Sequence, residues 1–193
     1  ETVVDGDGKP LTRLLTWLDT RAAPQCEKLG QMMDAYELYR RTGCPPLFIY
    51  PLAKVLWMRE NMPGPYARCR RVLSAKDYIV QRMLGEARID PSVAAGSQML
   101  NIHDLTWDRN VLEAAGIEED RLPALCDGTE VVAEVPRAVA ERAGLRAGTP
   151  VILGASDGAL SSVGLGSVGE GVAAVNLGSS GAIRVVSERP LVD

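Results

Sequence analysis

One segment, residues 150–159, constrains the fold more than any other part of this 193-residue chain. It reads as a short apolar run, three small residues, an aspartate and then a stretch able to form a helix. In α/β folds, a buried strand that breaks into a helix presents its polar residue at the carboxyl end of the sheet, where such folds bind ligands. The pattern predicts an α/β fold and makes Asp157 the first candidate for chemistry. The alternative is that Ser156 or Asp157 only caps the helix.

A second segment rich in small residues follows downstream. Two strands are expected at 172–177 and 182–186, joined by a Gly-Ser-Ser-Gly loop that begins at Gly178. Glycine lets the backbone approach a ligand closely, and the hydroxyls of Ser179 and Ser180 suit the oxygens of a phosphate. A plain hairpin turn built from the same residues is the alternative.

Five elements occur in a fixed order along the chain. They are Trp-x-Asp-x-Arg at 17–21, Pro-x-x-Lys-φ-x-Trp-φ-x-Glu-Asn at 51–61, Lys-Asp-Tyr-Ile at 76–79, the turn at 154–159 and the loop at 178–181. The second is the most specific, because it fixes seven positions in eleven. Together these elements resemble the FGGY carbohydrate kinases of the actin, hexokinase and Hsp70 superfamily, and the gluconate-kinase-like branch is the nearest.

The resemblance implies a ribonuclease-H-like α/β architecture. We expect residues 1–170 to form part of the first, sugar-binding lobe, with a mostly helical insertion at about 24–122. Residues 171–193 then form the opening hairpin of the second, nucleotide-binding lobe. The family's Asp-x-Gly-Thr phosphate-binding strand and nearly all of its second lobe are missing from this sequence. The chain is therefore expected to be a truncated fragment that does not transfer phosphate alone.

The activity implied by the resemblance is transfer of a phosphoryl group from ATP, with Mg²⁺, to a hydroxyl of a sugar or a sugar acid such as gluconate. By the same resemblance Asp157 is the general base and Gly158 adjoins the sugar. Gly178, Ser179 and Ser180 then face the ATP phosphates. A xylulose-, ribulose- or glycerol-type kinase of the same family remains an alternative, as does a non-catalytic sugar-binding relative.

The amino-terminal segment offers candidates for contact with the sugar. Strands are expected at 2–4 and 11–17, paired around a tight turn. Beyond them come Trp17, Asp19 and Arg21. Alternation along a strand would place these three side chains on one surface, where an apolar wall, an acceptor and a donor suit a polyol. The alternative is an Asp19–Arg21 ion pair that only stabilises the turn.

Asp90 is a further substrate candidate, on the resemblance of residues 89–97 to a family stretch that usually reads Thr-Asp-Tyr-Ser-x-Ala-Ser. Here Pro91 replaces the aromatic residue, which in some members lies near the sugar, so a substrate contact at position 91 does not carry over. An aspartate followed by proline and serine equally suits a helix cap, with Pro91 at the first helical position.

Apolar spacing predicts the remaining elements. Trp57 is expected in the core, whereas Lys54 and Glu60 are of types usually found at the surface. Helices are expected at 26–41, 51–61, 74–84, 111–115, 136–143 and 159–166, with strands at 131–135 and 151–153.

Composition argues against several other classes of protein. The net charge of −4 disfavours a nucleic-acid partner, and no apolar run reaches the roughly 18 to 20 residues of a membrane span. The four cysteines lack Cys-x-x-Cys spacing and His103 is the single histidine, so neither a zinc site nor a dithiol motif is supported. We expect a cytoplasmic protein with reduced thiols that binds ATP and a small sugar; a homodimer is compatible with this expectation.

Overall fold

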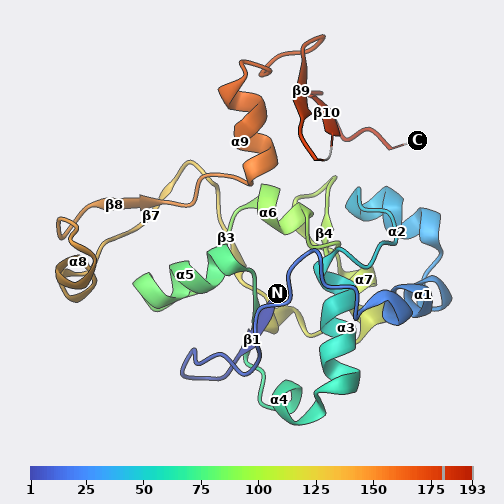
Figure 1. Ribbon diagram of the computed structural model, residues 1–193, viewed down its shortest axis with the longest axis horizontal. Coiled ribbons are helices and arrows are strands. Elements are labelled where there is room, and N and C mark those ends of the chain that lie inside the picture. The colour runs from blue at the N-terminus through green and yellow to red at the C-terminus, as the bar shows by residue number, and fades with distance from the viewer. Residues whose placement is uncertain (180, 193) are drawn as a thin grey trace.

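The computed structural model describes residues 1–179 and 181–192. The helices are α1 (Ala23–Met32), α2 (Ala35–Thr42), α3 (Pro51–Asn61), α4 (Pro63–Ala67), α5 (Ala75–Leu84), α6 (Pro91–Ala95), α7 (Arg109–Ala115), α8 (Arg137–Ala143) and α9 (Asp157–Gly164), with a short 3₁₀ helix at Glu119–Arg121 (Figure 1). The strands are β1 (Thr2–Val4), β2 (Arg71–Leu73), β3 (Arg88–Ile89), β4 (Leu100–Asn101), β5 (Thr106–Trp107), β6 (Ala124–Leu125), β7 (Val131–Glu134), β8 (Pro150–Ile152), β9 (Ala173–Leu177) and β10 (Gly181–Val185).

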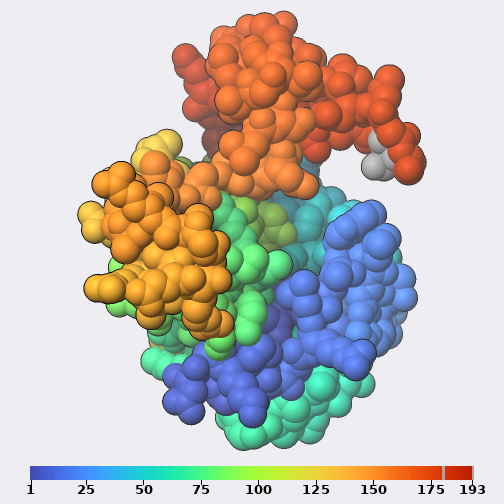
Figure 2. All heavy atoms as spheres, turned by 60° about the vertical axis from the view of Figure 1, so that its left-hand side comes forward, coloured from blue at the N-terminus to red at the C-terminus, as the bar shows by residue number. Residues whose placement is uncertain are grey.

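The described strands pair two by two. β3 and β6 run parallel, whereas β1–β2, β4–β5, β7–β8 and β9–β10 are antiparallel. Helices α1 to α7 and the first six strands form the main body, while the β7–β8 ribbon with α8 extends to one side (Figure 1). Figure 2 shows α9 and the β9–β10 hairpin standing above this body. No helix among the described residues is long and apolar enough to cross a membrane.

Helix α3 lies at the centre of the core. Its Leu52, Val55 and Leu56 are fully buried, as predicted, and pack in one apolar cluster with residues of α1, α2, α7, β1 and β4. Trp57 is partly buried against the same cluster, which agrees with the expectation of a core role. Full burial of one such aliphatic side chain typically stabilises a fold by about 1.5–3 kcal/mol. The α3 stripe therefore anchors the helical part of the chain.

Local signals set several helix ends as predicted. Ser74 and Asp77 form a reciprocal capping box at the start of α5, and Gly85 ends that helix in the left-handed conformation. Asp90 caps α6 by accepting from the backbone N–H groups of Ser92 and Val93. Each of these ends depends on residues within four positions of it, which is why the sequence alone locates it.

The expected pairing of 2–4 with 11–17 is wrong. β1 pairs with β2, from the middle of the chain, and residues 11–17 form no strand. This segment still runs beside β1, because the Leu11 N–H donates to the Val3 carbonyl at 2.8 Å and the Leu15 N–H donates to the Glu1 carbonyl at 2.7 Å. Trp17, in a turn beyond them, therefore does not share a strand face with Asp19 and Arg21.

Two further expectations need correction. The helix predicted over 26–41 is split into α1 and α2, because Asp34 caps a new helix by accepting from the Glu37 N–H at 2.9 Å. The strand at 151–153 is only partly buried: β8 has β7 as its partner and Ile152 is 53% exposed, whereas Leu153 is buried. An apolar run has the same composition whether or not another layer covers it, so the sequence could not show this exposure.

Candidate active site

Asp157 is the first residue of α9, and a four-residue loop joins it to β8. Ser156 is the helix cap, since its side chain accepts from the Ala159 N–H at 3.4 Å. The Asp157 carboxylate is exposed, and its Oδ1 accepts from the Gly158 N–H at 2.7 Å. The capping alternative thus belongs to Ser156, and the Asp157 carboxylate faces solvent at the start of the helix.

The loop that leads to Asp157 rests on the main body at two points. The Gly154 N–H donates to the Gly128 carbonyl at 2.8 Å, and the Ser156 N–H donates to the Ser92 hydroxyl at 2.8 Å. The first contact is so close that a Cβ on Gly128 would lie 2.2 Å from the Gly154 carbonyl oxygen. Residue 128 therefore has to be glycine for this arrangement.

Asp90 lies beside this loop, since the Ser92 hydroxyl contacts both Asp90 and the Ser156 N–H, and it is only 1% exposed. Its Oδ1 accepts from Ser92 and Val93, and its Oδ2 forms an ion pair with the Lys76 Nζ at 2.5 Å. Burial alone would raise the pKa of Asp90, but the hydrogen bonds from Lys76 and Ser92 outweigh it and lower that pKa. The capping alternative for Asp90 is confirmed, while its contact with a substrate stays a prediction.

A cavity of about 450 Å³ opens beside the amino-terminal segment. Trp17, which is 67% exposed, and Tyr50 contribute aromatic rings to its wall. Glu1 and Lys54 contribute an acidic and a basic side chain. An apolar wall with a few polar groups is typical of a site for a small ligand.

Lys54 is 2% exposed, in contrast to the surface position that its residue type favours. Its ammonium donates to the carbonyls of Phe48 and Ile49, at 2.9 Å each. Burial lowers the pKa of Lys54, and the negative charges of Asp19 and Glu1 partly offset this effect. Burial likewise raises the pKa of Glu1. Burial therefore disfavours the charged form of both side chains.

Asp19 and Arg21 form the internal ion pair that was the alternative to a sugar contact. The Arg21 Nη2 lies 2.6 Å from the Asp19 Oδ2, and the guanidinium also stacks on the Trp57 ring at 4.7 Å. The hydrogen bond from Arg21 lowers the pKa of Asp19 to about 2. This pairing fixes the turn that follows Trp17, and it leaves the predicted contact with a sugar untested.

The β9–β10 hairpin packs on α9 beside Asp157. Arg184 of β10 donates to the Asn176 side chain at 2.9 Å, and Ser161 of α9 lies 3.2 Å from the same oxygen. A Cβ on Gly158 would lie 3.2 Å from the Arg184 Nε, so the absence of a side chain at 158 makes room for the guanidinium. Sequence reasoning missed Arg184.

Gly178 and Ser179, the predicted phosphate contacts, are exposed at the start of the hairpin loop. Ser180, the third predicted contact, lies outside the described residues. A role in binding phosphate remains a prediction for all three.

Helix α6 connects the cavity beside Trp17 to Asp157. Ser92, in its first turn, contacts the loop before Asp157, and Gly96, just after its last turn, lines the cavity. One short helix thus supports both the candidate base and the candidate ligand pocket.

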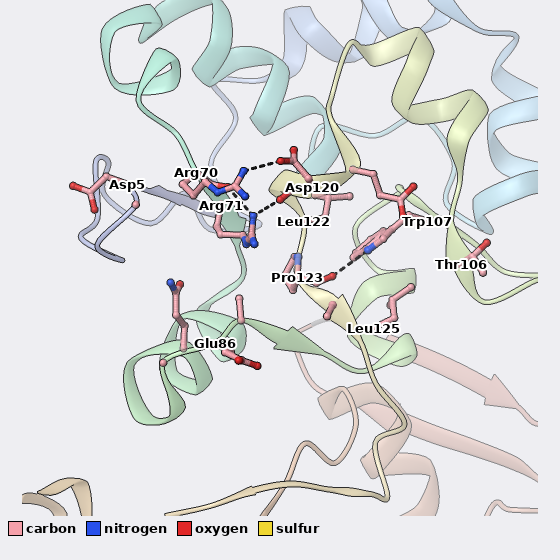
Figure 3. A pocket seen from close by; sticks show the side chains of 16 residues that line it. Asp5, Arg70, Arg71, Glu86, Thr106, Trp107, Asp120, Leu122, Pro123 and Leu125 are labelled. Atoms are coloured by element: carbon pink, nitrogen blue, oxygen red, sulfur yellow. Dashed lines mark hydrogen bonds and ion pairs between the residues drawn. The ribbon is translucent and has the colours of Figure 1, made fainter. Parts of the chain in front are cut away.

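A second cavity, of about 710 Å³, lies at the amino ends of β3 and β6 (Figure 3). Its Arg70 forms an ion pair with Asp120 at 2.6 Å, and its Arg71 donates to the Asp120 carbonyl. Asp90 lies at the opposite, carboxyl end of β3, where α/β folds usually bind ligands. We therefore do not place the active site in this cavity, whose arginines are engaged by Asp120.

Sequence reasoning did not predict Glu1, Tyr50 and Lys54 as cavity residues. Lys54 stands in the most specific motif of the chain, and its place in that motif was the available signal. Tyr50 directly precedes the proline that starts α3, and Glu1 offered no pattern at all. Their convergence requires the amino terminus of the chain to meet the start of α3.

Asp77 gives the fold a testable pH dependence. Burial, followed by the negative charge of Glu1, raises the pKa of Asp77 to about 6 from 3.8, and its Oδ1 is buried without a hydrogen-bond partner. Because the folded state then holds this proton more tightly than the unfolded state, we expect the free energy of unfolding to fall as the pH rises from about 4 to 7. Asp77→Asn should reduce the change in the free energy of unfolding over this pH range by on the order of 1–3 kcal/mol.

Urea unfolding at pH 4.5 and pH 7.5 measures the effect. Glu130→Gln, which neutralises an exposed acid, is the control. An equal pH dependence in the parent and in Asp77→Asn would contradict the assignment.

Among the described residues, no group of three or more His, Cys, Asp or Glu side chains is placed to hold a metal ion. The four cysteines are free thiols, and two of them, Cys44 and Cys69, are buried. Burial raises the pKa of Cys44 to about 11.

Residues 1–164 match the N-terminal domain of the FGGY family of carbohydrate kinases. The chain is 34% identical over 190 residues to a gluconokinase of Bacillus subtilis strain 168, covering 98% of this chain and 37% of that protein. It is 33% identical to a xylulose kinase of Escherichia coli K12, covering 97% and 38%. The crystal structure of a gluconate kinase from Lactobacillus acidophilus superimposes with a TM-score of 0.94 at 31% identity, covering all of this chain and 39% of that one.

The chain thus spans somewhat over a third of the length of these relatives. The expected fold class, an α/β first lobe of the actin and hexokinase type, is confirmed by the solved structures that it matches. On the match of residues 1–164, the chain belongs to the FGGY family of carbohydrate kinases.

Proposed function

We propose that this chain is the sugar-binding part of an ATP-dependent carbohydrate kinase that phosphorylates a sugar acid such as gluconate. The observation that carries the proposal is the exposed Asp157 carboxylate at the start of α9, supported by the same helix, α6, that borders the cavity beside Trp17. The similarity to gluconokinases supports gluconate as the substrate.

In the proposed reaction Asp157 is the general base. Its Oδ1 is oriented by the Gly158 N–H, which leaves Oδ2 to accept the proton of the attacking hydroxyl. The hydroxyl oxygen forms a bond to the γ-phosphorus as the bond between that phosphorus and the bridging oxygen breaks, and ADP leaves with the electron pair. Phosphoryl transfer depends mainly on positioning and electrostatics, so the geometry of the Asp157 loop is the chain's main contribution.

The cavity beside Trp17 is the proposed site for the sugar. The aromatic rings of Trp17 and Tyr50 would cover its apolar C–H faces, and the charged groups of Glu1 and Lys54 would meet hydroxyls. Asp19 and Arg21 would act at the rim of this site, while Asp90 and Gly158 would lie nearer the reacting hydroxyl. Each of these contacts is a proposal.

The nucleotide would approach from the side of the β9–β10 hairpin. Gly178, Ser179 and Ser180 would face the phosphates of ATP, and Mg²⁺ would be held largely by those phosphates, as is usual for this ion. The bound ion would neutralise charge that develops on the phosphoryl oxygens. Exposed Gly178 and Ser179 fit this role, since backbone N–H groups at a small-residue turn suit phosphate oxygens.

We also propose that residues 1–170 belong to the first lobe and residues 171–193 to the second. The exposed apolar side chains of the hairpin support this division: Leu177 is 88% exposed and Ile183 is 75% exposed. Apolar groups of this kind usually pack against further protein.

We further propose that the protein is located in the cytoplasm.

The test is phosphoryl transfer by the complete kinase that contains this chain. Gluconate, xylulose, ribulose and glycerol are each supplied with Mg²⁺ and ATP, and ADP release is measured. We expect the highest kcat/KM with gluconate. The similarity to xylulose kinases makes xylulose the second candidate. Transfer to none of the four substrates would contradict the proposal.

Asp19→Ala separates a sugar contact from a structural ion pair. If Asp19 reaches the sugar, we expect the KM for the sugar to rise with little change in the KM for ATP, because a lost hydrogen bond to a hydroxyl is typically worth about 0.5–3 kcal/mol. Steady-state kinetics of the complete kinase measure both constants. Equal changes in the two KM values, or a lower Tm alone, would assign Asp19 to the turn.

A further inference from the structure

A chain of polar contacts runs from α5 through α6 to the start of α9. The Lys76 Nζ lies 2.5 Å from the Asp90 Oδ2, the Ser92 hydroxyl contacts the Asp90 Oδ1, and the Ser156 N–H donates to the Ser92 hydroxyl at 2.8 Å. Ser156 is the residue directly before Asp157 and the cap of α9. The contacts therefore end one residue from the proposed base.

The direction of each hydrogen bond is fixed by the groups involved. A backbone N–H can only donate, so the Ser92 oxygen accepts from Ser156. The single hydrogen of that hydroxyl is then free to be donated to Asp90, an ionised carboxylate that only accepts. Bonds aligned in this way polarise one another, and the buried position of Asp90 strengthens them.

Capping of α6 does not by itself require this arrangement. Asp90 caps α6 through the backbone N–H groups of Ser92 and Val93, at 3.0 and 3.1 Å. The Ser92 hydroxyl makes the additional contact, which joins residues 64 positions apart in the chain. This contact is one of the two hydrogen bonds that hold the loop before Asp157 on the main body.

We propose that Lys76, Asp90 and Ser92 form a positioning relay that fixes the start of α9, and hence the place where the Asp157 carboxylate meets the substrate hydroxyl. The catalytic part of this inference rests on the proposed role of Asp157 as the base. Lys76 holds Asp90, Asp90 holds the Ser92 hydroxyl, and Ser92 holds the backbone of Ser156. None of the three needs to touch the reacting atoms.

Ser92→Ala tests the relay in two measurements. In the 193-residue chain, we expect amide hydrogen exchange of the segment 153–160 to accelerate about tenfold, because the Ser156 N–H loses its acceptor. In the complete kinase, we expect kcat to fall about tenfold, as for one net hydrogen bond, with both KM values within about twofold. Ser92→Thr keeps the hydroxyl, so we expect its exchange rate at 153–160 and its kcat to be close to those of the parent.

Asp90→Asn has a matched control in Asp108→Asn. Asp108 is also a buried helix cap, for α7, and it also pairs with a cation, Arg41, at 3.2 Å. We expect both substitutions to lower the Tm, but only Asp90→Asn to lower kcat and to accelerate exchange at 153–160. This difference separates positioning of Asp157 from a general loss of stability.

Three outcomes would overturn the relay. In the first, Ser92→Ala leaves both kcat and the amide hydrogen exchange of 153–160 unchanged, while Asp157→Asn is inactive. This result leaves the proposed function intact. Another is an equal loss of kcat in Asp108→Asn and Asp90→Asn. The third is normal kcat in Asp157→Asn, which removes the base assignment and the positioning role together.

Discussion

Asp157→Asn in the complete kinase is expected to lower kcat at least about a hundredfold. A positioned general base typically contributes about 10²–10⁴-fold in rate, and a hundredfold loss corresponds to about 2.7 kcal/mol of barrier. The substitution removes the basic oxygen but leaves the helix cap intact, because Ser156 caps α9. An Asn side-chain oxygen can still accept from the Gly158 N–H.

The measurement is steady-state transfer to the best substrate, with a thermal melt and the KM for ATP recorded for the same preparation. Asp120→Asn is the matched control, since Asp120 is an exposed aspartate with a hydrogen-bond partner, Arg70, outside the proposed site. We expect this control to retain kcat. Near-parental kcat in Asp157→Asn, with the fold intact, would make Asp157 a structural residue of the first helical turn.

Gly128→Ala should destabilise the chain by about 1–3 kcal/mol, the usual cost of forcing extra atoms into a packed site. The added Cβ would lie 2.2 Å from the Gly154 carbonyl oxygen, which is backbone and cannot rotate away. The loop before Asp157 must therefore move. In the complete kinase the same substitution should also lower kcat, because the displaced loop carries the proposed base.

Gly64→Ala is the control, since a Cβ there would have no heavy atom within 4 Å. It should leave stability unchanged or raise it by up to about 1 kcal/mol through the unfolded state. Urea unfolding of the two variants beside the parent measures the contrast. Equal unfolding midpoints for Gly128→Ala and the parent would show that the contact between residues 128 and 154 is not tight in solution.

Part of the site could be predicted from the sequence, because the signals for it lie within a few consecutive residues. The capping box of α5, the cap at Asp90 and the helix start beside Asp157 each depend on a few consecutive residues. The motif at 51–61 placed α3 at its observed bounds, since a proline start and a continuous apolar stripe define a helix without reference to the rest of the chain.

Other expectations failed because they concerned partners distant in the chain. Residues 11–17 have the composition of a strand, yet β1 pairs with β2, about 70 positions further along. Lys54 has the residue type of a surface position but is buried, since two carbonyls in the turn just before α3 accept hydrogen bonds from its ammonium. Composition cannot reveal such compensation, because the acceptors are backbone groups that every residue carries.

The sequence by itself determined the family, several of the helix ends and the identity of Asp157 as the leading candidate, because each is written in short, ordered runs of residue types. Only the tertiary structure decided that Asp90 is buried against Lys76 and that Ser92 reaches the loop before Asp157. The physical reason is the separation along the chain between the groups that interact. A cap is satisfied within one helical turn, whereas a buried charge or a loop contact requires segments that meet only after the whole chain has packed.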